Sequence, residues 1–319
     1  MKLTKIYSLV LIIIILITSS AVKAQQELLM NQYIFNGLAI NPAVAGSFNG
    51  YELRAMHRMQ WFTFPGGPVT TTINGSVKYK NNGIGLNLLR DQTGPLIYYS
   101  AELNYAYHIR FNESQNFLGL GLSGRLMNIR LEPRRRDIDY SSDVVLTNAM
   151  NGKNSGDFNA GAFYHTPTIT AGFAARNIAG IKFDFAKDFN RAEVSRFYRH
   201  YYLYGSYKYK KLKNIIVEPS LLFKKSENVK PIQYDITLRA HFIEEQLMAG
   251  ISYRSPQQIA IMAGAKFDRK FYINFAYDFN TYNTLQKYSG GSFELMLGLN
   301  LYHDITEDPY YKKDNLIDY

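Results

Sequence analysis

Residues 96–111 read LIYYSAELNYAYHIRF, and their side chains alternate in polarity with a period of two. Every second position is apolar or aromatic: Tyr99, Ala101, Leu103, Tyr105, Tyr107, Ile109 and Phe111. The positions between them are mostly polar or charged: Ser100, Glu102, Asn104, His108 and Arg110. Because successive side chains of a strand point to opposite sides, the stretch predicts a β-strand with one apolar face and one charged face.

The same alternation returns along the rest of the chain, for example in residues 232–242 and 293–301. In the first of these, Ile236 and Leu238 alternate with Asp235 and Arg239. We count about fourteen such segments of roughly ten residues, the length that a tilted strand needs to cross a bilayer. The composition agrees, since 26 Tyr and 20 Phe accompany a single Trp, and barrel strands that face lipid carry many aromatic residues.

The connections between these segments alternate in length. Long loops are expected near residues 62–70, 91–95, 130–156 and 177–199, and tight turns near residues 81–83, 112–116, 166–168 and 210–214. Outer-membrane barrels have short periplasmic turns and longer outer loops. We therefore predict an all-β fold, a transmembrane antiparallel β-barrel of about 14 strands in the outer membrane, formed by residues 51–302. The alternative is a soluble β-sandwich or propeller, whose strands average about five or six residues.

The N-terminus predicts export. Lys2 and Lys5 precede an apolar run at residues 9–17, and small residues lead to Ala24. This pattern indicates a signal peptide at residues 1–24, cleaved near Ala24. A single membrane anchor is the alternative, but the run is shorter than the roughly 20 residues of a spanning helix. The chain contains no Cys, which excludes disulfides, thiol catalysis and a lipid-anchored cysteine at the N-terminus.

Residues 25–50 separate the signal peptide from the first strand. Residues 31–47 read NQYIFNGLAINPAVAGS, an apolar stretch that Asn, Gly and Pro interrupt too often for a regular helix or strand. An even strand count places both ends of the barrel in the periplasm, so this segment either plugs the lumen or meets a partner there. The candidate docking or partner-binding residues are Gln32, Tyr33, Phe35, Asn36, Leu38, Ile40, Asn41 and Pro42. The polar tail, residues 303–319, is also expected in the periplasm.

No enzyme class is indicated by the motifs. The chain has no nucleophile elbow, zinc-protease motif or P-loop, so we expect no catalysis, no cofactor and no metal. Lumen-facing His108 and His241 are interpreted as lining residues, with a Ser–His site as the alternative. The net charge of +10 falls to +7 when Lys2, Lys5 and Lys23 leave with the signal peptide. The remaining basic residues are scattered along the chain, which argues against nucleic acid.

Charges of both signs lie on the polar faces of the expected strands. They are Glu52, Arg54, Arg58, Glu102, Arg110, Arg125, Asp235, Arg239, Lys266, Asp278 and Glu294. Mixed signs favour paired charges that fill a lumen over a selectivity ring of one sign, although a water-filled porin with a mixed lining remains an alternative. An outer-loop basic cluster, Arg134, Arg135 and Arg136, is either solvated or in contact with acidic glycolipid or an acidic partner.

Several short motifs occur in a specific order along almost the whole mature chain. They are QYIFN (32–36), LAINPA (38–43), AGS (45–47), RHYY (199–202), EPSLL with Lys224 (218–224), YD (234–235), GISYR (250–254), AYD (276–278) and SGGS (289–292). In this order they resemble the PorP/SprF family, outer-membrane proteins of the type IX secretion system and of the gliding machinery coupled to it.

The resemblance implies an accessory, non-enzymatic role in type IX secretion. The implied partners are other components of the machine, such as periplasmic ring or peptidoglycan-associated proteins, and possibly one secreted cargo such as a gliding adhesin. The residues by themselves reach only a barrel with an extra N-terminal segment. An outer-membrane pore for passive diffusion of small solutes is therefore the alternative function.

Overall fold

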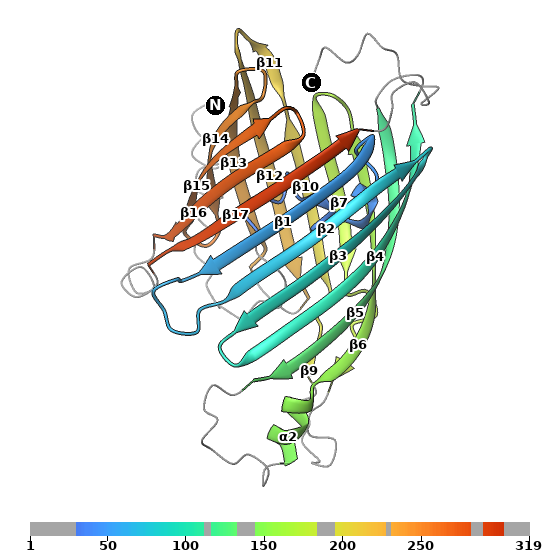
Figure 1. Cartoon of the computed structure of the whole chain (residues 1–319), viewed down its shortest axis with the longest axis vertical. Coiled ribbons are helices and arrows are strands. Elements are labelled where there is room, and N and C mark those ends of the chain that lie inside the picture. Colours follow the sequence, from blue (N-terminus) through green and yellow to red (C-terminus); the bar gives the residue numbers. More distant parts are fainter. Residues whose placement is uncertain are drawn as a thin grey trace, which may run out of the picture.

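The computed structural model describes residues 30–111, 116–132, 144–183, 195–227, 231–281 and 290–302. Within them, fourteen antiparallel strands form a closed barrel (Figure 1). The strands are β1 (Gly50–Gln60), β2 (Val69–Tyr79), β3 (Asn82–Thr93), β4 (Leu96–Arg110), β5 (Phe117–Leu131), β6 (Lys153–His165), β7 (Ile169–Arg176), β10 (His200–Tyr207), β12 (Ile215–Ser226), β13 (Gln233–Phe242), β14 (Leu247–Arg254), β15 (Gln258–Phe267), β16 (Phe271–Asn280) and β17 (Ser292–Tyr302). The short β11 (Tyr209–Leu212) extends β10 beyond Lys208 along β12.

Two pairings close the barrel. The first strand pairs with the last, in a register that puts Gly50 opposite Tyr302 and Gln60 opposite Ser292. The second pairing joins β10 to β12. Closure leaves no open sheet edge, as hydrocarbon surroundings require, because lipid offers no partner for an unpaired backbone group.

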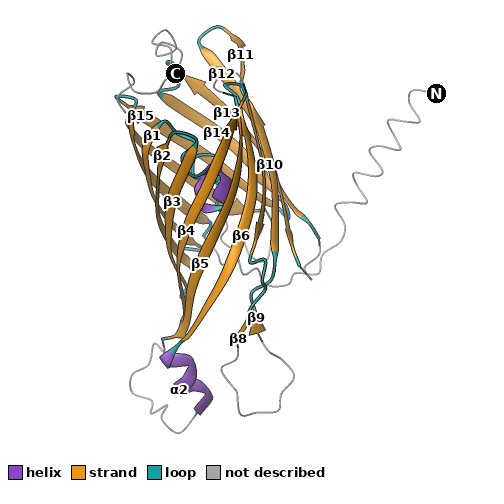
Figure 2. Ribbon diagram, turned by 90° about the vertical axis from the view of Figure 1, so that its right-hand side faces the viewer, coloured by secondary structure: helices purple, strands orange, loops and turns teal. Residues whose placement is uncertain are grey.

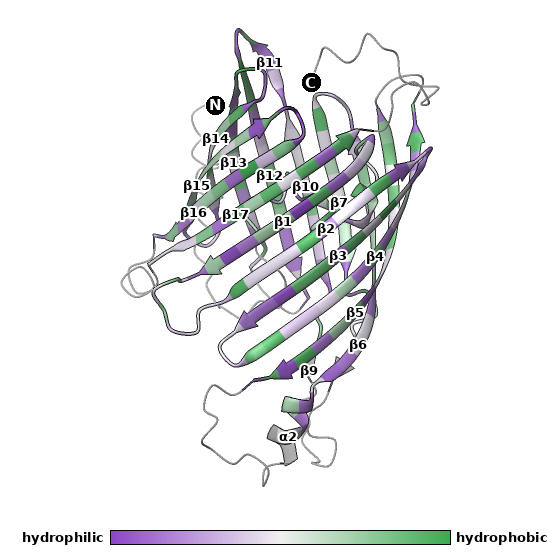
Figure 3. Cartoon of the chain, viewed as in Figure 1, coloured by the Kyte–Doolittle hydropathy of each residue, from purple (hydrophilic) through white to green (hydrophobic). Residues whose placement is uncertain are grey.

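The outer surface of the barrel is apolar and the lumen is polar. Leu103 is 62% exposed and its neighbour Glu102 only 2%, and Leu126 is 72% exposed beside Arg125 at 4%. Figure 3 shows the resulting alternation of green and purple along the strands. The predicted barrel fold and the predicted two-faced strands are confirmed.

The connections give the barrel two different ends. The turn end carries residues 80–81, 166–168, 243–246 and 268–270, and the loop end carries residues 61–68, 132–152 and 177–199. The described parts of the last two loops include a helix, α2 (Val144–Asn151), and the pair β8 (Lys182–Phe183) and β9 (Ser195–Arg196). They lie at the same end of the barrel (Figure 2). Among the described residues, no helix has both the length and the apolar character needed to span a membrane.

Several loop and turn predictions were wrong in detail, since residues 69–70, 82–83, 130–131 and 210–212 lie in β2, β3, β5 and β11. Residues 91–93 belong to β3, where Asp91 pairs with Tyr98, so only Gly94 and Pro95 connect β3 to β4. Gly94 makes this tight connection possible because it adopts a φ of +58°, which glycine tolerates without steric cost. Residues 153–156 belong to β6 because their backbone pairs with β5. The α2 helix was not predicted.

Candidate functional site

The lumen segment, which we define as residues 30–49, lies inside the barrel (Figure 2). It contains two single-turn 3-10 helices, η1 (Gly37–Ala39) and η2 (Pro42–Val44). Among the eight residues predicted from the sequence, Phe35 is half-buried and the others are buried, namely Gln32, Tyr33, Asn36, Leu38, Ile40, Asn41 and Pro42. The structure therefore brings all eight into one segment that packs against the barrel wall.

Local sequence accounts for the turn at Asn41. Its backbone is extended, with φ −139° and ψ 114°, as expected for a residue that precedes proline. Pro42 opens η2, and the Asn41 side chain accepts a hydrogen bond of 3.0 Å from the backbone N–H of Ala43. Asparagine is a favoured N-cap and proline a favoured first residue. The Asn-Pro pair thus separates the two single-turn helices: extended Asn41 follows η1, and Pro42 starts η2.

The same Asn41 fastens the lumen segment to one side of the wall. Its Nδ2 donates to the carbonyl oxygens of Ala162 in β6 (3.0 Å) and Phe173 in β7 (3.3 Å). It also lies 3.2 Å from the hydroxyl of Tyr204 in β10. Asn41 is completely buried, so losing its amide would leave these wall groups short of a partner, at a cost of about 1–3 kcal/mol.

Glycines in the wall let the backbone of the segment come into direct contact with the strands. A Cβ on Gly121 of β5 would lie 2.3 Å from the backbone nitrogen of Ala43, and one on Gly161 of β6 would lie 2.0 Å from Oδ1 of Asn41. Real Cβ atoms do not approach so closely. Any other residue at these positions would displace the segment.

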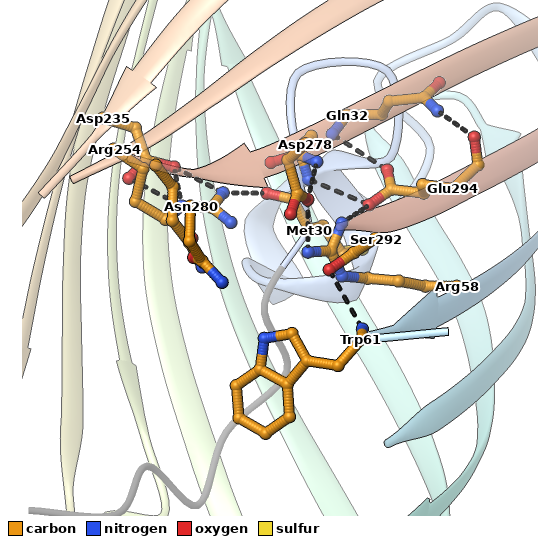
Figure 4. A network of polar contacts seen from close by, with 12 residues as sticks. Met30, Gln32, Arg58, Trp61, Asp235, Arg254, Asp278, Asn280, Ser292 and Glu294 are labelled. Carbon is orange, nitrogen blue, oxygen red and sulfur yellow. Dashed lines mark hydrogen bonds and ion pairs between the residues drawn. The ribbon is translucent and has the colours of Figure 1, made fainter. Parts of the chain in front are cut away.

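A cluster of buried charges holds the start of the segment on the opposite side (Figure 4). Glu294 of β17 accepts hydrogen bonds from the backbone N–H groups of Asn31 (3.0 Å) and Gln32 (3.1 Å). Arg58 of β1 lies 3.1 Å from Glu294 and 2.6 Å from Asp278 of β16. The Asn31 amide donates to Asp278 at 2.7 Å. Hydrogen bonds to ionised groups are about twice as strong as neutral ones.

A second arginine binds the first described residue of the segment. Arg254 of β14 donates to the carbonyl of Met30 at 2.7 Å and forms an ion pair of 2.6 Å with Asp235 of β13. Further pairs inside the barrel are Arg54–Glu52, Arg176–Glu102 and Arg239–Glu218. The prediction that the lumen charges form pairs is confirmed for these residues. Arg176, Glu218 and Arg254 were not among the lumen charges predicted from the sequence, although Glu218 and Arg254 lie in the motifs EPSLL and GISYR and each faces the polar side of a strand.

A polar cavity separates the segment from the turn end. It has a volume of about 280 Å³, and its charged lining includes Glu52, Arg54, Lys208, Glu218, Glu245 and Lys266. At its rim the Lys208 ammonium lies 2.9 Å from the Glu245 carboxylate. Burial raises the pKa of Glu245, but the charge and hydrogen bond of the Lys208 ammonium, together with the nearby His241 and Lys266, hold that pKa below its ordinary value.

The two histidines considered from the sequence lie against other residues of the barrel interior. His241 lies 2.8 Å from Glu218, and His108 packs on the ring of Phe117. Ser226 and His200 do approach to 2.7 Å, but both are buried in the barrel interior. The described residues contain no group of three or more His, Cys, Asp or Glu placed to hold a metal. The basic cluster Arg134, Arg135 and Arg136 lies outside the described residues.

The family model "Type IX secretion system membrane protein PorP/SprF" matches residues 22–299. The chain belongs to the PorP/SprF family. This confirms the resemblance carried by the ordered motifs, and the match includes the whole lumen segment. A closed barrel of this family is a membrane component of type IX secretion, located in the outer membrane.

Solved structures with a similar fold are outer-membrane barrels. Omp33 of Acinetobacter baumannii is 7% identical with a TM-score of 0.45, over 80% of this chain and 100% of that one. The CymD monoaromatic hydrocarbon channel is 11% identical with a TM-score of 0.47, over 84% and 93%. The KdgM porin is 12% identical with a TM-score of 0.38, over 79% and 99%. No curated protein sequence matches the chain.

Proposed function

We propose that this PorP/SprF protein is a closed, non-enzymatic scaffold that assists the export or surface attachment of type IX cargo, such as a gliding adhesin. The observation that carries the proposal is the lumen segment, which is fastened to both sides of the barrel interior. Asn41 binds β6, β7 and β10 on one side, and residues 30–32 bind charged groups of β14, β16 and β17 on the other.

The strength of this anchoring supports a scaffold over a diffusion pore. The backbone N–H groups of Asn31 and Gln32 and the carbonyl of Met30 all bind ionised side chains. Each hydrogen bond to a charged group contributes about 1.5–3 kcal/mol. A solute crossing the lumen would have to displace a segment held by several such bonds at once.

The proposed orientation puts the turn end in the periplasm and the loop end at the cell surface. The longest connections, residues 61–68, 132–152 and 177–199, all lie at one end and support this assignment, although β3–β4 and β14–β15 are joined at that end by only two and three residues. The cavity of about 280 Å³ and the lumen segment beneath it would then face the periplasm, where the other parts of the machine assemble. We propose that this periplasmic face binds a machine component, and that the loop end contacts the cargo.

Deleting residues 28–47 while keeping the signal peptide tests the proposal. The purified full-length protein should be almost silent in planar bilayers, and the truncated barrel should still insert and should conduct. In cells, the truncated protein should reach the outer membrane at the normal level but fail to support surface display of the cargo. Large, steady conductance of the full-length protein would favour the diffusion pore. Normal cargo display with the truncated protein would refute the role of the segment.

A further inference from the structure

Two arginines face outward on the lipid side of the barrel near the loop end. Arg90 in β3 pairs in register with Tyr99 of β4, and Arg130 in β5 pairs with Ile97 of β4. Arg90 Nε lies 3.4 Å and Arg130 Nη2 lies 3.5 Å from the hydroxyl of Tyr99. Strand alternation places all three side chains on the same face as Leu103, which is 62% exposed. The two guanidinium groups, both half-buried, therefore flank one phenol oxygen on this face, where Ile97 beside Arg130 is fully buried.

Their height on the barrel identifies the boundary of the outer leaflet. Tyr99 is close to the first residue of β4, Leu96, which lies at the loop end. An outward arginine is strongly unfavourable at the middle of a bilayer but nearly neutral at the interface. The pair therefore lies where lipid headgroups begin, given the orientation proposed above.

An apolar hollow opens beside the arginines, on the side toward the middle of the membrane. Its floor is Ala101 of β4, which pairs with Leu88 on one neighbouring strand and Leu126 on the other. Leu126 in turn pairs with Gly156 of β6. The hollow has a volume of about 820 Å³ and an apolar part formed by Ile73, Leu88, Tyr99, Ala101 and Leu126. Its lining also includes Arg90 and the polar residues Thr71, Asn128, Asn154 and Ser155.

We propose that Arg90, Arg130 and this hollow bind one phosphorylated glycolipid of the outer leaflet. A phosphate of the headgroup would accept hydrogen bonds from both guanidinium groups, which match its geometry and charge, and an acyl chain would fill the hollow over Ala101. Arg90 Nη2 donates to Oε1 of Gln92 at 2.7 Å, and among the residues that the structure describes no carboxylate forms an ion pair with either arginine. A phosphate would supply the counter-charge that these described residues do not.

Native mass spectrometry of the purified full-length protein with diphosphorylated lipid A tests this site. The wild type should bind one lipid, and should bind the dephosphorylated form at least tenfold more weakly. The double variant Arg90→Gln/Arg130→Gln should lose at least tenfold in affinity. Lys225→Gln is the matched control, because Lys225 is an exposed cation near the loop end of β12 and does not line the hollow. Its affinity should stay within twofold of the wild type.

A second variant tests the hollow without changing charge. Ala101→Leu should fill the hollow and weaken lipid binding several-fold, while an outward leucine remains compatible with the lipid face. Equal binding of the two lipid forms, unchanged binding by the double arginine variant, or an equal loss with Lys225→Gln would overturn the proposal. Because the assay is done in detergent and needs neither conductance nor cargo, its failure can be distinguished from failure of the proposed scaffold function.

Discussion

Replacing Gly121 with alanine should loosen the lumen segment without disturbing the strand. A Cβ there would lie 2.3 Å from the nitrogen and 2.4 Å from the Cα of Ala43, and 2.5 Å from the carbonyl carbon of Pro42. Ordinary contact begins at 3.4 Å, and all three atoms belong to backbone. No side-chain rotation relieves the overlap, so the segment has to move by roughly 1 Å, a shift of the kind that overpacking imposes.

The expected magnitude follows from the cost of overpacking, which is about 1–3 kcal/mol in a well-packed interior. Strand β5, which carries Gly121, is held by hydrogen bonds to β4 on one side and β6 on the other. We therefore expect the substitution to destabilise the docked position of the lumen segment and not the strand. An energy of about 1–3 kcal/mol corresponds to a population change of about 5- to 150-fold. The undocked fraction of the segment should rise by that factor.

A single cysteine can report this fraction, because the natural chain has none. Val44→Cys introduces a thiol of similar size at a position that is 8% exposed. A buried thiol reacts with maleimide in proportion to the time that it is open to solvent, so Gly121→Ala should accelerate its labelling in the purified barrel about 5- to 150-fold. Gly124→Ala is the control on the same strand, because a Cβ there meets nothing within 4 Å. Equal labelling rates with and without Gly121→Ala would refute the reasoning, as would equal acceleration by the control.

Three further predictions concern anchoring and orientation. Asn41→Ala should destabilise docking by about 1–3 kcal/mol and accelerate labelling of the Val44→Cys thiol, whereas an unchanged rate would show that its wall contacts are dispensable. Glu294→Gln should lower the midpoint of heat-dependent gel migration, because breaking a buried ion pair from one side costs about 3–5 kcal/mol; an unchanged midpoint would contradict the anchoring. On intact cells, Asn148→Cys in the loop end should react with an impermeant maleimide and Asp268→Cys in the turn end should not. The reverse pattern would invert the proposed orientation.

The strands could be predicted from the sequence because a two-faced strand in lipid leaves a strong signal. Each residue of β4 meets either hydrocarbon or the lumen, so polarity alone assigns its direction, as Leu103 and Glu102 illustrate. The ends of the strands carry less information. Asp91 and Lys153 are polar residues that suit a loop as well as the end of a strand. Only their pairing with β4 and β5 shows that they belong to strands. Helix α2 was missed because it has only eight residues, with no acidic residue in its first turn and no basic residue in its last, and because Gly152 after it, with a φ of +79°, was not read as a helix end.

The sequence marks residues 31–47 as an irregular apolar stretch, but it does not identify the barrel residues that bind them. Asn31 was not singled out, although its backbone and side chain both bind the charged cluster. Glu294 is separated from Asn31 by 263 positions, and nothing local marks one as the acceptor of the other. A sequence shows which charges face the lumen, whereas the register of the closed barrel decides which of them meet.

Lumen-facing glycine is the signal that would have located the docking surface. A barrel of this size has interior space that side chains normally fill. On β5, the lumen-facing positions between the lipid-facing leucines include Ser123 and Arg125, whose side chains enter this space. Gly121 on the same face supplies no side chain at all. A glycine in a strand interior weakens the strand and commonly marks the close approach of another backbone. When the glycine lies on the lumen-facing side of a membrane strand, the approaching backbone has to lie inside the barrel. Among the described residues, the irregular segment before β1 is the element that lies inside the barrel. Gly121 and Gly161 therefore mark on the wall the places where the Asn41-Pro42 turn is held.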